Sequence, residues 1–207
     1  MVSDDAWTVG NCSRVEDWLA RQARAHQARL GGATVRVLDA ACGIGLPGHQ
    51  LRLGGYKGII IGTDISPGMV ARTLARGAHN SAFVADANEG LTLESGTFDL
   101  VVCTGAMELL QHAVVLREFA RLLKPAGELW ASFQHEEASP HALSSVVSRH
   151  PTAHQNVFGV TTAELHAELL AAGLKLIEEE RCDAAFYTPR DGSLLPVPYL
   201  MVRASIS

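Results

Sequence analysis

The stretch VRVLDAACGIGLPG, residues 35–48, decides the fold of this chain. Its first half, 35–40, is a short apolar run of the kind that forms a buried strand of a parallel sheet. Its second half contains Gly43 and Gly45, which let the backbone bend tightly and approach a ligand, and Pro47, which suits the first turn of a helix. The stretch therefore predicts a strand, a ligand-facing loop and a helix whose first N–H groups face an anion.

The same alternation of strand and helix continues along the chain. Ser66 and Pro67 predict a helix start, with Gly77 as its end, and Thr161 with Glu164 predicts a capping box. Lys124-Pro125 should end a helix before the next strand begins. The predicted helices span 14–30, 67–77, 112–123 and 161–173, with a further helix in the stretch 44–53 that has Pro47 in its first turn. The predicted strands span 35–40, 58–65, 81–87, 98–106 and 127–133.

The C-terminal part of the chain differs because no helix separates its two apolar segments. Residues 174–188 and 198–205 flank the turn signal PRDG and should pair as an antiparallel hairpin, with Pro196 and Pro198 delaying the start of the second strand. We therefore predict an α/β fold: a doubly wound, seven-stranded, mostly parallel sheet with a C-terminal antiparallel hairpin and helices on both faces.

Composition fits one globular domain with a sizeable core. The chain has 207 residues, 47% of them hydrophobic, and a mean hydropathy of +0.12. A formal net charge of −5 provides no global field for nucleic acid. The four cysteines form no CxxC pair and have no histidine at metal spacing, so we expect neither a zinc site nor a disulfide framework. The acidic start MVSDDAWT and the absence of a long apolar run predict a cytoplasmic protein with no membrane partner.

The ends of the predicted strands carry the polar residues. Ligands of an open α/β sheet collect outside the carboxyl ends of its strands. Asp39, Asp64 and Asp86 stand there, so three acidic side chains should rim one edge of the crevice, while Cys103 and Thr104 close the fourth strand. A ligand with hydroxyl and amine donors and a cationic centre would satisfy these carboxylates, whereas a pyrophosphate close to Asp39 would be repelled.

With these motifs, residues 33–204 resemble the class I S-adenosylmethionine-dependent methyltransferases. LDAACGIG is similar to the family's glycine-rich signature, although Ala41 stands where the family often has glycine. FDLVVCTGAMELL and LLKPAGELW resemble its fourth-strand segment and the approach to its fifth strand. The family's closing hairpin, which inserts the seventh strand between the fifth and sixth, matches the hairpin described above.

The resemblance implies that S-adenosylmethionine is the cofactor and S-adenosylhomocysteine the product. It implies that Asp39, Gly43 and Gly45 surround the methionine portion, that Asp64 binds the ribose, and that Asp86 and Ala87 lie at the adenine. Relatives also use an N-terminal segment to cover the cofactor, so residues 1–32 should cover the site. The further cofactor-binding candidates are Trp7, Ala41, Ile65, Met69, Cys103 and Thr104.

Two other readings of the glycine loop stay open. Gly43, Gly45 and Gly48 satisfy GxGxxG, which is weak evidence for a dinucleotide-binding oxidoreductase. That reading leaves Asp39, Asp86 and the closing hairpin without a use. The second is a fold that binds the sulfonium cofactor without transferring its methyl group, as a cyclase or a scaffold.

The catalytic candidates are His135 and Glu136, which follow the predicted fifth strand. The pKa of histidine suits proton removal at neutral pH, although a solvated loop start would look the same. Residues 134–160 are longer than a routine connection and predict a lid-like insertion. Arg14, Arg21, Arg24 and Arg29 make the polar side of the first helix basic, which indicates either a solvated face or attraction of an acidic substrate.

The substrate is narrowed by what the fourth-strand segment lacks. It reads CTGA where methyltransferases acting on planar amino groups typically show an Asn/Asp-Pro-Pro-aromatic motif. No nucleic-acid-binding module fits beside the core, and no metal site is expected. We therefore predict methyl transfer to an oxygen, nitrogen or carbon of a small metabolite.

Overall fold

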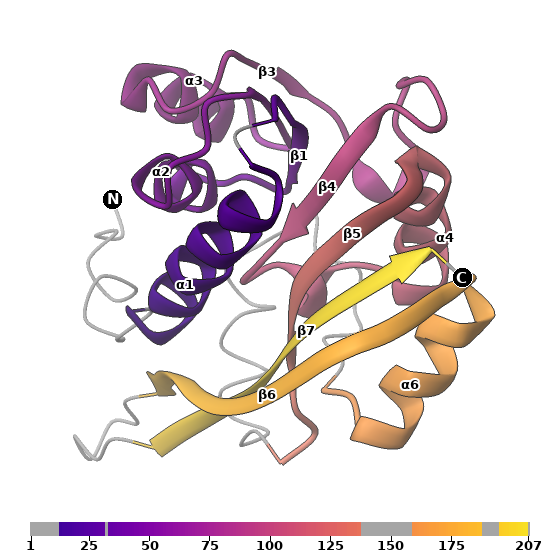
Figure 1. Cartoon of the computed structure of the whole chain (residues 1–207). Helices are drawn as coiled ribbons and strands as arrows, with labels where there is room; N and C mark the ends of the chain where they lie inside the picture. Colours follow the sequence, from indigo (N-terminus) through magenta and orange to yellow (C-terminus); the bar gives the residue numbers. More distant parts are fainter. Residues whose placement is uncertain (1–12, 32, 138–158, 188–194, 207) are drawn as a thin grey trace.

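The computed structural model describes residues 13–31, 33–137, 159–187 and 195–206 (Figure 1). The helices are α1 (Ser13–Arg29), α2 (Leu46–Leu53), α3 (Pro67–Arg76), α4 (His112–Leu122) and α6 (Thr162–Ala171), with short 3-10 turns η2 (Ala87–Glu89) and η3 (Met107–Leu109). The strands are β1 (Arg36–Ala40), β2 (Ile59–Asp64), β3 (Ser81–Val84), β4 (Phe98–Cys103), β5 (Leu123–Gln134), β6 (Leu174–Tyr187) and β7 (Leu195–Ile206).

These strands form one seven-stranded sheet in the order β3-β2-β1-β4-β5-β7-β6. The first five strands are parallel, and β7 is antiparallel to both β5 and β6. The predicted fold class, including the placement of the last strand, is confirmed. The carboxyl ends of β1 to β5 consequently meet along one edge of the sheet.

Helices cover both faces of the sheet (Figure 1). On one face α4 and α6 bury a core that includes Phe119 and Leu165, and on the other α1 and α2 bury a core that includes Trp18 and Leu51. Trp18 and Leu19 on α1 are each 1% exposed. The two cores pack against opposite faces of the sheet and so fix the strands whose carboxyl ends form this edge.

The predicted helix ends agree with the structure. Ser66 accepts a hydrogen bond from the Met69 N–H at the start of α3, and Gly77 ends that helix at φ 76°. Thr161 and Glu164 form both bonds of a capping box at the start of α6. These signals act within one turn of chain, which is why the sequence alone reveals them.

The start of β5 differs from the prediction. The strand begins at Leu123 directly after α4, and Leu123 pairs with Phe98. The next β4–β5 pair joins Leu100 to Glu128, so Lys124-Pro125 lies in a bulge of the strand, and Ala126 there has φ 63°. Regular pairing with β4 resumes at Glu128, one residue after the start of the predicted strand 127–133. The bulge accommodates Pro125, which has no N–H to donate to the neighbouring strand.

The prediction that the prolines delay β7 is wrong. The strand begins at Leu195 and pairs with β6 through both Pro196 and Pro198. The carbonyl of Pro198 accepts a hydrogen bond from the His135 N–H at 2.9 Å, and the β5–β7 pairs end one position earlier, at Gln134 and Tyr199. The missing N–H of Pro198 therefore falls where the pairing of β7 with β5 ends, so little pairing with β5 is lost. The predicted turn PRDG lies outside the described residues.

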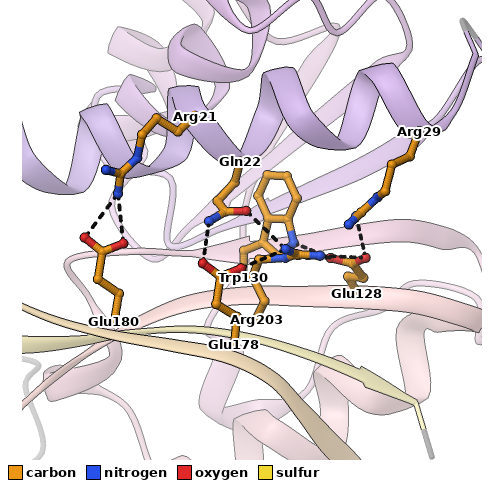
Figure 2. A network of polar contacts seen from close by, with 8 residues as sticks. All are labelled: Arg21, Gln22, Arg29, Glu128, Trp130, Glu178, Glu180 and Arg203. Carbon is orange, nitrogen blue, oxygen red and sulfur yellow. Dashed lines mark hydrogen bonds and ion pairs between the residues drawn. The ribbon is translucent and has the colours of Figure 1, made fainter.

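The basic side of α1 pairs with the sheet below it (Figure 2). Arg21 donates to Glu180 on β6, and Arg29 donates to Glu128 on β5. Beneath them Arg203, 8% exposed at its side chain, binds Glu128 and Glu178. Arg21 and Arg29 thus attach the helix to its own sheet while their side chains stay 55% and 51% exposed. Arg14 and Arg24 are also exposed, so the reading as a solvated face agrees with the structure.

Candidate functional site

The glycine loop lies between β1 and α2, at the carboxyl edge of the sheet. Gly43 has φ 54° and Gly45, the residue before α2, has φ 79°, a region that favours glycine. A Cβ atom on Gly43 would meet no other atom within 4 Å, so the loop is open at this residue. The predicted loop, with a backbone that a ligand can approach closely, is present.

Asp39 lies beneath this loop rather than beside the cleft. Its carboxylate has no exposed surface; it accepts hydrogen bonds from the Nε2 atom of His79 at 2.8 Å and from the Gly48 N–H at 3.2 Å. Gly48 is in the first turn of α2, so the carboxylate caps that helix from below. The expectation that three carboxylates rim the crevice is therefore wrong for Asp39, because the buried His79 ring turns it inward.

Burial raises the pKa of Asp39 above its usual value, although the hydrogen bond and charge of His79 and the Gly48 N–H oppose this shift. The other oxygen of Asp39, Oδ1, and the Nδ1 atom of His79 have no hydrogen-bond partner among the described residues. A Cβ atom on Gly48 would lie 2.2 Å from the His79 ring, so this position requires glycine. The pair thus fixes the underside of the loop.

Asp64 ends β2 and joins that strand to the glycine loop. One carboxylate oxygen accepts from the Gly43 N–H at 2.9 Å and the other from the Ser66 N–H at 2.9 Å. The residue is half-buried, so the carboxylate keeps a face toward the edge of the sheet. Next to it, Ile65 is 45% exposed, and Met69 lies in the first turn of α3.

Asp86 and Ala87 follow β3, which ends at Val84, three residues earlier than the predicted 81–87. Asp86 is half-buried and caps η2 by accepting a hydrogen bond from the Asn88 N–H. Ala87 is 6% exposed and packs on the core. Asp86 thus shares the partly open position of Asp64.

Cys103 and Thr104 close β4 at the same edge. Cys103 is fully buried, and its thiol pKa is raised well above the usual value by burial and by the charges of Asp39, Glu108 and Asp64. Thr104 is half-buried, and the N–H of Gly105 donates to Ser132 on β5 at 2.8 Å. Cys103 therefore sits among acidic groups from β1, β2 and η3.

The catalytic candidates lie at the end of β5. His135 is 6% exposed and forms an isolated bridge with Val160, and its Nδ1 atom accepts from the Glu137 N–H at 3.3 Å. Glu136 is exposed. Residues 138–158 of the expected lid lie outside the described residues. Residues 1–12 of the expected N-terminal cover, which include Trp7, lie outside them as well, so neither part is tested. Where α1 is described, it packs on a sheet face.

His79 and Glu108 are two polar residues of this region that the sequence reasoning missed. Glu108 follows β4 on η3, is 3% exposed and accepts a hydrogen bond from the hydroxyl of Tyr199 at 2.9 Å. The partner lies 91 positions away on β7, so no local pattern reveals the contact. The one available signal was a charged residue in the apolar run AMELL, directly after a strand end.

A cavity of about 540 Å³ lies between η3, the start of α4 and α6. His112 lines it, with its two ring nitrogens 2.9 Å from a carboxylate oxygen of Glu168 and from the Met107 carbonyl. The other lining residues are Leu109, Leu110, Gln111, Ala113, Val114, Gly159, Val160 and Glu164.

Two kinds of feature are absent from the described ranges. No three or more histidine, cysteine, aspartate or glutamate side chains gather there at a spacing that could hold a metal ion. Among the helices of those same ranges, none combines the length and apolar character that crossing a membrane demands.

Comparisons with known proteins agree with this geometry. Residues 37–127 match the family model described as a methyltransferase domain. The chain is 34% identical over 165 residues to a ubiquinone biosynthesis O-methyltransferase of Xanthomonas oryzae; the alignment covers 72% of this chain and 66% of that protein. The chain thus spans just under two thirds of the length of that curated relative.

Two further similarities differ in extent. An 18S rRNA (guanine-N(7))-methyltransferase of Bos taurus is 35% identical over 77 residues, which is 37% of this chain and 27% of that protein. The structure of an S-adenosylmethionine-dependent methyltransferase from Mesorhizobium loti superposes with a TM-score of 0.67 at 18% identity, covering 92% of this chain and 97% of that chain. The sheet order, the glycine loop tied to Asp64 and these similarities agree: the chain belongs to the class I S-adenosylmethionine-dependent methyltransferases.

Proposed function

We propose that this chain transfers a methyl group from S-adenosylmethionine to a hydroxyl oxygen of a small molecule. The observation that carries the proposal is the loop of Gly43, bound through its N–H to the half-buried carboxylate of Asp64 at the edge where β1 and β2 end. The curated relative named as a ubiquinone biosynthesis O-methyltransferase supports an oxygen acceptor. The relative with a nitrogen acceptor that is at least 30% identical, the rRNA (guanine-N(7))-methyltransferase, aligns over 37% of this chain.

The residues at the edge fit the cofactor on three observations. The loop is open at Gly43, and Gly105 likewise would place a Cβ atom in open space. Asp64 and Asp86 are half-buried carboxylates that can accept hydrogen bonds from hydroxyl or amine donors. The carboxylates of Asp39, Asp64 and Glu108 give the edge a negative character that suits a cationic ligand.

When bound, S-adenosylmethionine supplies a methyl group already activated on a sulfonium sulfur. In our proposal Asp64 accepts hydrogen bonds from the ribose hydroxyls, and Asp86 with Ala87 lies at the adenine. Ile65 and Met69 border the same region, while Cys103 and Thr104 lie beside the cofactor. Asp39 contributes through the loop that it holds from below, together with Ala41, Gly43 and Gly45.

The protein's contribution to rate is mainly alignment of the acceptor with the C–S bond and exclusion of water. Such alignment can supply on the order of 7–11 kcal/mol of the barrier. A hydroxyl acceptor also needs a group that takes its proton. His135 with Glu136 is the base that the sequence predicted, and it stays a prediction, as do a lid at 134–160 and a cytoplasmic location.

A small-molecule acceptor is part of the proposal. The alignment with the rRNA methyltransferase covers 37% of this chain, whereas the alignment with the O-methyltransferase covers 72%. The net charge of −5 also provides no global attraction for a polyanion. Both points favour a small molecule over nucleic acid.

The test is ligand binding measured by thermal shift and calorimetry. S-adenosylmethionine and S-adenosylhomocysteine should raise the melting temperature, and NAD should not. Asp64→Ala should weaken binding of both ligands by about 1–3 kcal/mol, or roughly 5- to 150-fold, because it removes a buried acceptor. The measurement thus tests both the cofactor and the residue that holds it.

Asp99→Ala is the matched control. Asp99 also accepts a backbone hydrogen bond, from the Arg36 N–H, but at the opposite edge of the sheet where β1 and β4 begin. Its loss should leave ligand affinity unchanged. Stabilisation by NAD alone, or equal affinity in wild type and Asp64→Ala, would contradict the proposal.

A further inference from the structure

Glu108 is a buried carboxylate with one unused oxygen. Its Oε1 atom accepts from the Tyr199 hydroxyl at 2.9 Å, whereas its Oε2 atom is buried and has no hydrogen-bond partner among the described residues. Leaving a buried carboxylate oxygen without a donor is costly, so such an atom needs an explanation. A hydrogen-bond donor supplied by a bound ligand would provide that explanation.

A second unused acceptor lies close to the first. Gln134 is 2% exposed, and its Oε1 atom also lacks a hydrogen-bond partner within the described ranges. Gln134 and Tyr199 are direct partners in the β5–β7 pairing, so their side chains share a face of the sheet. Two unsatisfied acceptors beside one hydroxyl suit a ligand that brings hydrogen-bond donors.

This pair of acceptors lies next to the proposed cofactor site. Glu108 follows the end of β4 by five positions, and β5 ends at Gln134, so both belong to the carboxyl edge. The charge of Glu108 also acts on the Cys103 thiol together with those of Asp39 and Asp64. A molecule that contacts Glu108 would therefore be close to whatever the glycine loop holds.

We propose that Glu108 is the catalytic base for a hydroxyl-bearing acceptor, oriented by Tyr199, with Gln134 receiving a second donor of the same molecule. The inference deepens the proposed function and rests on it. The acceptor O–H bond breaks and its proton moves to Oε2 of Glu108. A lone pair of the acceptor oxygen, which has lost its proton, forms the new bond to the methyl carbon, and the pair of the breaking C–S bond stays on sulfur.

The surroundings of Glu108 make this role testable by pH. Burial raises the pKa of Glu108, while the hydrogen bond from Tyr199 and the charge of His112 oppose the rise. The Cys103 thiol on β4 is the other titratable group that the structure couples to it. A base acts only when unprotonated, so turnover should fall as the pH falls through a pKa above that of an ordinary glutamate.

The experiment uses the full chain, with catechol as the hydroxyl-bearing probe and 1,2-dimethoxybenzene as the probe without hydroxyls. Calorimetry measures binding of each probe to protein saturated with S-adenosylhomocysteine, and a rate assay with S-adenosylmethionine gives turnover against pH. Wild type should bind catechol and not the dimethoxy compound. Glu108→Gln should bind S-adenosylhomocysteine normally, bind catechol at least 10-fold more weakly and lose about 10²–10⁴ in turnover.

Two further variants keep the test decisive if Glu108→Gln fails to fold. Tyr199→Phe removes a bond that lowers the pKa of Glu108, so the acid limb of its pH profile should move to higher pH. His135→Ala tests the competing assignment of the base to His135. This variant should keep the acid limb, because in our proposal Glu108 produces it. An acid limb that persists in Glu108→Gln, or one that disappears in His135→Ala, would overturn the proposal.

The outcomes separate this inference from the proposed function. Failure of wild type to bind S-adenosylhomocysteine would overturn the proposed function and this inference with it. Normal binding of S-adenosylhomocysteine without catechol binding would overturn the hydroxyl-bearing class alone. Normal catechol binding and turnover in Glu108→Gln would overturn the role of Glu108 as the base, while the proposed methyl transfer would still stand.

Discussion

Ala41 is a residue whose backbone conformation conflicts with its side chain. It has φ 52°, in the left-handed region that a residue with a Cβ atom rarely adopts. From the sequence, Ala41 differed from the family's signature only in standing where glycine is common. The structure adds a consequence, which is strain in the loop itself.

We therefore expect Ala41→Gly to raise the free energy of unfolding by about 1 kcal/mol, because glycine adopts this conformation without the Cβ clash. Urea unfolding at neutral pH measures the change. Ala120→Gly, inside α4, is the control and should lower the free energy of unfolding by about 1 kcal/mol. A loss of stability in Ala41→Gly would show that the loop is relaxed around alanine.

At the residue scale the sequence located Asp64 but misjudged Asp39. Both end neighbouring strands, and position along a strand is readable from the pattern of apolar residues. What decides their directions is His79, which reaches Asp39 from 40 positions away, after α3. Such a long-range contact depends on the packed fold, so the sequence predicted the place of each carboxylate but not which one faces outward.

The helix α6 shows what capping residues contribute at the scale of an element. Its first residue follows Thr161, and Val160 before it is hydrogen-bonded to the end of β5, with its N–H donating to Gln134. The capping box therefore fixes both the helix start and the chain segment beside His135. Loss of the cap should loosen this junction.

Thr161→Ala should lower the free energy of unfolding by about 1 kcal/mol, since the side-chain oxygen that accepts the Glu164 N–H is removed. Thr161→Ser keeps the oxygen and should stay within a few tenths of a kcal/mol of wild type. Chemical denaturation of the three proteins side by side measures both changes. Equal losses in the two variants would mean that the methyl group of Thr161, not the cap, provides the stability.

The boundaries of helices and strands were predicted well where the signals lie in the local sequence. They were predicted poorly where pairing with another strand sets the boundary. The caps of α3 and α6 fall within one turn, so their sequences suffice. The start of β5 at Leu123 and the entry of Pro196 into β7 depend on partners on other strands. A proline pattern alone does not show whether a bulge or a ladder end accommodates it.

At the scale of the whole molecule, the order of the strands came from the resemblance and from the closing hairpin. The attachment of α1 could not be predicted in the same way. Arg203 on β7 joins Glu128 on β5 and Glu178 on β6 to Gln22 on α1, so the network spans four elements that are distant in sequence (Figure 2). The sequence shows these charged and polar residues, but which of them pair depends on the order of the strands in the folded sheet.

This network makes the stability of the fold sensitive to acid. Burial alone would raise the pKa of Glu128, but hydrogen bonds from Trp130 and Arg203 and the charge of Arg203 hold the pKa below its usual value. A carboxyl group with a lowered pKa in the folded state stabilises the protein above its unfolded pKa. That stability is lost as the pH falls through the folded pKa.

Glu128→Gln should accordingly lower the free energy of unfolding at pH 7 by about 3 kcal/mol, because Arg203 loses a charged partner while it stays buried. Below the unfolded glutamate pKa of about 4.3 the wild-type value should fall toward that of the variant, so that the two curves converge in acid. Urea unfolding at several pH values measures both curves, with Glu94→Gln, at an exposed position before β4, as the control that follows wild type. Parallel curves for wild type and Glu128→Gln would show that α1 is held by its apolar contacts with Trp130 and not by this carboxylate.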